Sequence, residues 1–191
     1  MKAARLAFDN VACLRGERLL FEDLSFAIEA GGAAIVVGPN GVGKSSLLRI
    51  AAGLLHHMAG LVTRDGTIAF LGEQAALDTA MPLRRALGYW AAIDGAHDSA
   101  IDAALDALAI APLADVPVRM LSTGQRRRAG LARVMLGGAR IWLLDEPGNG
   151  LDTATLDLLG DAMAAHRAGG GLILAATHQP IGMPDAQEIR L

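Results

Sequence analysis

The sequence has one cysteine, Cys13, few aromatic residues and no excess of basic residues. A single cysteine excludes an intrachain disulfide and favours a reducing compartment. The formal net charge is -3 and the pI is about 5.9, whereas a nucleic-acid-binding domain usually carries a basic stripe. Nucleic acid is therefore not an expected partner. At 191 residues, the chain is expected to form one compact domain.

Long hydrophobic runs are also lacking, although apolar residues make up 52% of the chain. Much of this fraction is alanine, and no uncharged, glycine-poor run is long enough to span a bilayer. Residues 1–5 lack the apolar core of a signal peptide, so no leader is expected. A role at a membrane would therefore come through a partner chain.

The most informative stretch matches the pattern G-x-x-x-x-G-K-[ST] of a phosphate-binding loop. An apolar run that predicts a buried strand precedes it, and a helical pattern follows it, which is the context that the motif requires. The alternative is a glycine-rich turn that binds nothing. Backbone N–H groups of such a loop converge on phosphate oxygens, and its lysine and serine contact the terminal phosphates and Mg²⁺. The predicted nucleotide-binding residues are Gly38, Pro39, Asn40, Gly41, Val42, Gly43, Lys44, Ser45 and Ser46.

Apolar periodicity predicts the other elements. Strands are expected at 4–8, 24–28, 33–37, 67–71, 141–144 and 172–176. Helices are expected after the phosphate-binding loop as far as Gly53, around 83–90, from Ser99 to about 108 with Asp102 at position N3, and around 156–163. Tyr89 and Trp90 are interpreted as helix-packing residues. His56 and His57 are interpreted as exposed loop residues rather than metal ligands, because no other ligand type lies at suitable spacing.

Polar residues follow three of the predicted strands. Asp145 can hold Mg²⁺ opposite Ser45, or it can simply cap the next turn. Glu146 can orient or deprotonate the attacking water, or it can be an ordinary exposed carboxylate. Gln74 can position water and metal, and His178 can contact the γ-phosphate. Either of these two alone would be more typical of an ordinary surface residue, but together the set supplies positioning and charge for phosphoryl transfer.

A second candidate anion site lies at 121–125, far along the chain from the first. Ser122 followed by Gln125 is a capping-box pattern, so a helix should begin here, and its N-terminus attracts negative charge. The basic cluster 126–128 falls in the first turn of this helix. In an acidic protein, such a cluster is more typical of a solvated face than of a nucleic-acid site.

This order of motifs resembles the ATP-binding-cassette (ABC) ATPases over nearly the whole chain. Their phosphate loop, glutamine loop, signature, hhhhDE strand, Asp loop and switch histidine are similar to 38–45, 74, 121–125, 141–146, 149–152 and 178. The resemblance implies an α/β fold: a P-loop NTPase (RecA-like) core, a shortened antiparallel β subdomain and a helical signature subdomain. Residues 1–72 and 137–191 would form the core with its β subdomain, and 73–136 the helical subdomain.

The resemblance also implies the ligands and the assembly. ATP and Mg²⁺ would bind between two copies in a head-to-tail homodimer, with each signature facing the partner's nucleotide. Ser122, Gly124 and Gln125 would contact that nucleotide, and Asp152 would help to couple the two sites. The family usually stacks the base on an aromatic residue near the first strand, but 10–15 contains none, so base selectivity stays open.

Several strings are similar to the ATPase subunits of bacterial cytochrome c maturation (haem exporter) complexes. These strings lie at 18–21, 45–54, 86–90 and 177–180. The resemblance implies integral membrane partner subunits that dock on residues 73–95, a haem chaperone released by ATP hydrolysis, and a peripheral place on the cytoplasmic face of the inner membrane. Alternatives are the ATPase of another importer or exporter, a soluble ABC-type assembly ATPase, and a small-molecule kinase. The signature together with Glu146 argues against the kinase.

Overall fold

The computed structural model of the protein describes residues 3–191 and contains two β-sheets. The part of the leader-peptide prediction that falls on Met1 and Lys2 lies outside the described residues. The elements are β1 (Arg5–Arg15), β2 (Arg18–Glu29), β3 (Ala33–Val37), α1 (Lys44–Ala51), β4 (Ala59–Asp65), β5 (Ile68–Leu71), α2 (Leu83–Asp94), α3 (Asp98–Ala107), η1 (Ala111–Leu113), η2 (Val118–Met120), α4 (Thr123–Leu136), β6 (Ile141–Asp145), α5 (Thr153–Ala168), β7 (Leu172–Ala176) and β8 (Gln187–Arg190).

The central sheet is parallel, with the strand order β5-β6-β7-β3-β8. Two of its three interior strands, β6 and β7, are buried along their whole length, as expected for a parallel sheet covered on both faces. Alternate side chains of β6 divide between the two faces. Trp142 and Leu144 pack toward α5 and the helical part, whereas Ile141 and Leu143 pack toward α1.

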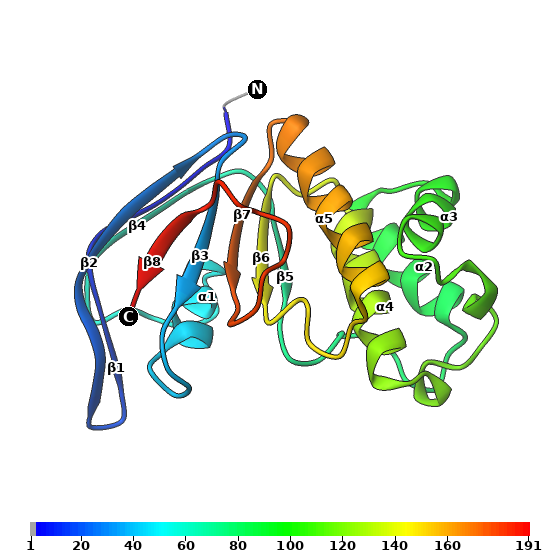
Figure 1. Cartoon of the computed structure of the whole chain (residues 1–191), viewed down its shortest axis with the longest axis horizontal. Helices are drawn as coiled ribbons and strands as arrows, with labels where there is room; N and C mark the ends of the chain where they lie inside the picture. Colours follow the sequence, from blue (N-terminus) through cyan, green and yellow to red (C-terminus); the bar gives the residue numbers. More distant parts are fainter. Residues whose placement is uncertain (1–2) are drawn as a thin grey trace.

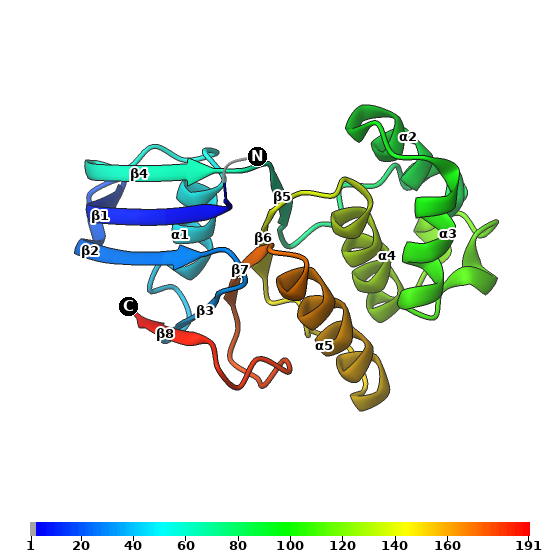
Figure 2. The ribbon, with the colours of Figure 1, turned by 90° about the horizontal axis from the view of Figure 1, so that it is seen from above.

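The second sheet is antiparallel, with the order β2-β1-β4. It curves over α1, which lies between the two sheets (Figures 1 and 2). The strands predicted at 4–8 and 24–28 are parts of this longer hairpin, and the unassigned stretch 54–66 contains β4. Among residues 3–191, no helix is long and apolar enough to cross a membrane.

Helices α2, α3 and α4 form a separate group at the far end of the molecule (Figure 1). The predicted cap at Ser99 is wrong: the N-cap of α3 is His97, two residues earlier, and Asp102 instead pairs with Arg84 of α2. The packing interpretation holds only in part. Trp90 donates from Nε1 to Ala76 O at 2.8 Å, but Tyr89 is 64% exposed.

Candidate functional site

The phosphate-binding loop connects β3 to α1 in the context that the motif requires. Gly38, Gly41 and Gly43 all have positive φ, at 150°, 78° and 126°. A side chain at Gly38 would also place its Cβ 2.9 Å from Leu191 O, so this turn needs glycine for both conformation and space. The loop therefore has the backbone conformation that exposes N–H groups to an anion at a helix N-terminus.

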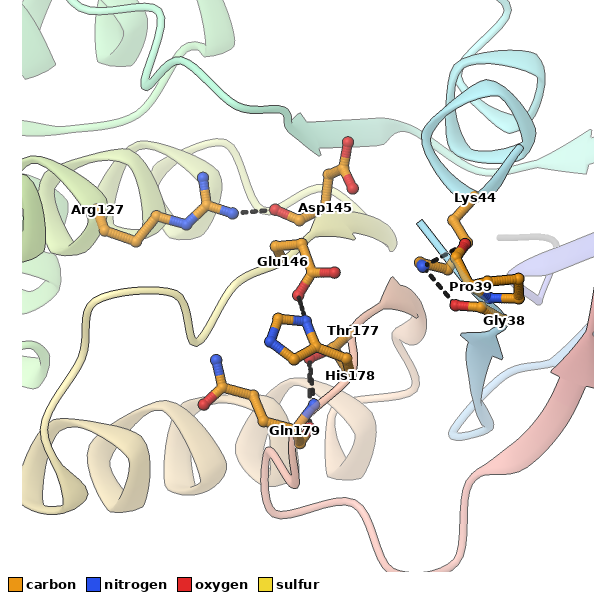
Figure 3. A network of polar contacts seen from close by, with 9 residues as sticks. All are labelled: Gly38, Pro39, Lys44, Arg127, Asp145, Glu146, Thr177, His178 and Gln179. Atoms are coloured by element: carbon orange, nitrogen blue, oxygen red, sulfur yellow. Dashed lines mark hydrogen bonds and ion pairs between the residues drawn. The ribbon is translucent and has the colours of Figure 1, made fainter. Parts of the chain in front are cut away.

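Lys44 is buried and turns back over the loop that precedes it. Its Nζ donates to Gly38 O at 2.6 Å and to Pro39 O at 3.2 Å (Figure 3). Carbonyl oxygens satisfy the ammonium group only in part, since they carry no full negative charge. A phosphate in the loop is a stronger partner for the same group.

Asp145 ends β6 and is buried beside Ser45. Burial raises the pKa of the Asp145 carboxyl, while a side-chain hydrogen bond with Ser45 opposes that rise. The two oxygen groups come from the ends of neighbouring elements at the carboxyl edge of the sheet, where ligands bind in open α/β folds. The pair is a fitting donor set for Mg²⁺, because hydroxyl and carboxylate oxygens are the ligands that this ion prefers.

Glu146 follows Asp145 in a left-handed conformation, with φ of 48°. For a residue other than glycine, this conformation costs about 1–2 kcal/mol. Its N–H donates to Ala176 O at 2.7 Å, and its Oε2 lies 2.9 Å from Nδ1 of His178 (Figure 3). Among the described residues, Oε2 has no other partner. The structure thus brings the predicted base and the predicted switch histidine together.

A cleft of about 780 Å³ opens beside these groups. Its lining includes Ser45, Asp145 and Glu146 from the sheet edge, Gln74 from the loop after β5, and Thr123 from the start of α4. The sequence prediction placed all but Thr123 around one nucleotide, and the fold gathers them in one cleft. The signature residue Ser122 and the switch histidine are outside this lining.

The turn before α4 is built as the capping box that the sequence predicts. Ser122 Oγ accepts from the backbone N–H of Gln125 at 3.2 Å, and the side chain of Gln125 accepts from Ser122 N at 2.8 Å. Ser122 is exposed. A Cβ at Gly124 would lie 2.7 Å from Gly150 O, so the signature turn packs directly on the turn that leads to Asp152.

Asp152 is the N-cap of α5. Its Oδ1 accepts from Thr155 N at 2.9 Å, and hydrogen bonds with the side chain and the backbone of Thr155 lower the pKa of the Asp152 carboxyl. The residue therefore has a structural partner within its own chain. It lies in the loop that packs on the signature turn through Gly150.

Arg127 is the site residue that sequence reasoning missed. The interpretation of 126–128 as a solvated face is wrong for this residue, which is 9% exposed. The helical period indicates the burial of Arg127, because this residue lies four and seven residues before the buried Leu131 and Val134. A residue at that spacing shares the inward face of the helix.

The fold and the site agree with comparisons to known proteins. The family described as ABC transporter matches residues 21–149. A solved structure titled as a putative ABC transporter (ATP-binding protein) from Pyrococcus furiosus has a TM-score of 0.85 and 23% identity, covering 98% of this chain and 97% of that one. The protein class is therefore that of the ABC transporter ATPases, which bind ATP and couple its hydrolysis to transport.

Curated relatives place the chain more narrowly. The "Cytochrome c biogenesis ATP-binding export protein CcmA" of Sphingopyxis alaskensis is 56% identical, with 96% of this chain and 95% of the relative covered. The protein of the same name from Zymomonas mobilis is 50% identical, with coverage of 98% and 85%. The chain belongs to the CcmA family of ABC transporter ATP-binding proteins.

Proposed function

We propose that this chain is the ATP-hydrolysing subunit of a cytochrome c biogenesis complex, in which it binds integral membrane subunits similar to CcmB and CcmC. It would lie on the cytoplasmic face of a bacterial inner membrane and would drive release of a haem chaperone on the other side. The observation that carries the ATPase is the cluster of Lys44, Asp145, Glu146 and His178 at one sheet edge. The family relatives support the cytochrome c role.

The phosphate-binding residues 38–46 would hold the triphosphate. Lys44 would exchange its two carbonyl partners for β- and γ-phosphate oxygens, which stabilises negative charge in the transition state. Ser45, Asp145 and Gln74 would hold Mg²⁺, which when bound shields the charge of the phosphates. Few protein ligands are needed, because this ion usually keeps waters and phosphate oxygens in its shell.

Glu146 would activate the attacking water. The carboxylate accepts a proton in the transition state, and the adjacent His178 Nδ1 lies close enough to fix its orientation. The imidazole would also contact the γ-phosphate. The left-handed backbone at Glu146 supports this role, since strained conformations persist where the surroundings hold them and often occur at active sites.

A second copy would complete the site. The signature residues lie at the N-terminus of α4, where Ser122 is exposed and Gly124 and Gln125 are half-buried, and they would contact the nucleotide held by the partner. Asp152 would couple the two sites, because its loop packs on the signature turn at Gly150. In this arrangement, ATP lies between two copies placed head to tail.

The docking surface for the membrane subunits would be the exposed side of α2, within residues 73–95. Tyr89 and Ile93 are one helical turn apart and are 64% and 57% exposed. Large apolar side chains that are exposed together often mark an interaction surface. The loop that carries Gln74 leads into this helix, so a partner bound here is connected to the catalytic cleft.

Tyr89→Asp and Ile93→Asp test this proposal in cells that also express the membrane subunits. We expect both variants to lose co-purification with the membrane subunits and to lose haem delivery, while the isolated chain keeps its ATPase rate. Leu54→Asp is the matched control, because Leu54 is 67% exposed but lies between α1 and β4, away from α2. Unchanged assembly and haem delivery in both α2 variants would contradict the docking surface.

A further inference from the structure

Arg127 is a charged residue that the proposed chemistry does not use, yet it is buried beside the catalytic carboxylates. Its Nη1 donates to Gly72 O at 2.7 Å, and its Nη2 donates to Asp145 O (Figure 3). Burial lowers the pKa of this guanidinium, and the charges of Asp145 and Glu146 oppose that effect. Among the described residues, Nε has no partner. A buried charge that lacks some of its hydrogen-bond partners costs folding free energy. Stability alone therefore does not explain why an arginine occupies this position.

The carbonyl that Arg127 contacts belongs to the peptide that joins Asp145 to Glu146. The N–H of the same peptide donates to Ala176 O of β7 at 2.7 Å. Both polar groups of this peptide are thus held, one by α4 and one by the sheet. This peptide sets the direction of the two carboxylates that flank it, and it leads into the left-handed backbone of Glu146.

The second contact of Arg127 is to the loop that carries Gln74. Gly72 O accepts from Nη1, and farther along α4 Arg133 donates from Nε to Ala75 O at 2.9 Å and from Nη2 to Phe70 O. The backbone on both sides of Gln74 is therefore fixed to the helix that begins after Ser122. Helix α4 connects the signature turn, the glutamine loop and the catalytic carboxylates through guanidinium groups.

We propose that Arg127 is a positioning residue for ATP hydrolysis, acting through the Asp145–Glu146 peptide. It holds Glu146 in the orientation that activates water and keeps that orientation fixed relative to α4. This proposal rests on the proposed role of Glu146. It assigns no contact between Arg127 and the nucleotide.

Arg127→Met separates positioning from folding. Methionine fills similar space and removes the desolvation cost of the buried guanidinium, but it leaves the carbonyls of Gly72 and Asp145 without these donors. Because these two effects oppose each other, we expect the unfolding midpoint to change little. We expect the KM for ATP to change less than about 3-fold, and kcat to fall about 10- to 100-fold, as for a small misplacement of a reacting group. Arg127→Lys, which keeps one donor group near the carbonyls, should recover part of kcat.

A double variant gives the sharper test. If Arg127 acts through Glu146, then adding Arg127→Met to Glu146→Gln should leave the residual rate unchanged, because the positioned group is already missing. Arg167→Gln is the matched control. Arg167 donates to Gly31 O at 2.9 Å and pairs with Asp185 at the opposite edge of the sheet, so its loss should leave kcat unchanged.

The outcomes separate this proposal from the function on which it rests. A wild-type chain without ATPase activity, alone or with membrane subunits, would contradict the proposed function. An active wild type with undiminished kcat in Arg127→Met overturns only the positioning role. Additive losses in the double variant, or a parallel loss of stability and ATP binding in both Arg127→Met and Arg127→Lys, would also overturn it.

Discussion

The sheet side and the helical side of the proposed nucleotide site are built in different ways. On the sheet side, Lys44 and Asp145 are buried at the ends of α1 and β6, which pack in the same hydrophobic cluster. On the helical side, Ser122 is exposed and its side chain is occupied by its own capping box. The sheet side carries a complete phosphate loop with an acid beside it. The helical side presents a helix N-terminus without such an acid or lysine, and in the proposed dimer it would contact a nucleotide held by another copy.

From this difference we expect the sheet side to carry the chemistry of hydrolysis and the helical side to take part in the pairing of two copies. Substitutions on the sheet side should stop hydrolysis, and they should leave the pairing of copies possible only where ATP still binds. Substitutions on the helical side should weaken the pairing that completes the site. The predictions below test that division, from the largest expected effect to the smallest.

Glu146→Gln should stop hydrolysis with ATP still bound. We expect kcat to fall about 10²- to 10⁴-fold, the range for loss of a general base. The amide cannot accept the proton, but it keeps the size and the position next to His178. Steady-state phosphate release measures the rate, and gel filtration with ATP should show a trapped dimer. Undiminished turnover would remove Glu146 as the base. Glu188→Gln, in the exposed pair with Arg190, is the control.

Lys44→Ala should remove the main charge contact to the phosphates. We expect kcat to fall about 10²- to 10³-fold, as for loss of one preorganised donor, together with weaker ATP binding and no ATP-dependent dimer. Equilibrium binding of a fluorescent ATP analogue and phosphate release measure both effects. The two variants should differ in pairing: Glu146→Gln should form the ATP-dependent dimer, and Lys44→Ala should not. A Lys44→Ala chain that binds ATP normally would contradict the assignment.

Gly124→Ala should act on the helical side alone. Its Cβ would meet Gly150 O at 2.7 Å, so the signature turn has to shift against the Asp loop. We expect about a 10-fold loss of kcat, or about 1.4 kcal/mol in the barrier, with ATP binding to the free chain unchanged. Gly160→Ala in α5 is the control, because there the nearest atom, Gly182 Cα, lies 3.7 Å away. Equal effects of the two alanines would contradict the packing argument.

Asp145→Asn should have the smallest effect, a change in folding stability. Unlike most substitutions, it should stabilise the folded chain. Burial raises the pKa of this carboxyl, so the folded chain binds its proton more tightly than the unfolded chain does. Ionisation therefore opposes folding at neutral pH, and this penalty disappears as the pH falls below the usual aspartate range.

The nucleotide-free Asp145→Asn variant should consequently unfold at a higher temperature than the wild type at pH 7, and the difference should vanish in acid. Thermal unfolding followed by circular dichroism across this pH range measures it. Stabilisation by Mg²⁺ with ATP should be lost in the same variant. A variant that is less stable than the wild type at pH 7 would show that the carboxylate is a net stabilising group.

The sequence predicted the sheet side better than the helical side, for a physical reason. The phosphate loop, β6 and β7 are short segments whose glycines and unbroken apolar runs allow few conformations. The capping box at Ser122 is equally local, and it too was predicted. Contacts between segments that are far apart in the sequence have no such local pattern to predict them. The pairing of Asp102 with Arg84 depends on how α2 and α3 pack together, and the contacts of Arg127 with Gly72 and Asp145 depend on how α4 packs against the ends of β5 and β6.

The most direct measurement is a disulfide crosslink between the two sides in different copies. In a Cys13→Ser, Glu146→Gln background, Asn40→Cys on the phosphate loop and Ser122→Cys on the signature turn would be placed on separate chains. Native Cys13 is the single cysteine and is buried, so its removal leaves one reactive pair. We predict an ATP-dependent crosslink between the two chains. A Ser122→Cys side chain that never crosslinks to another copy's loop, with ATP bound, would contradict the account.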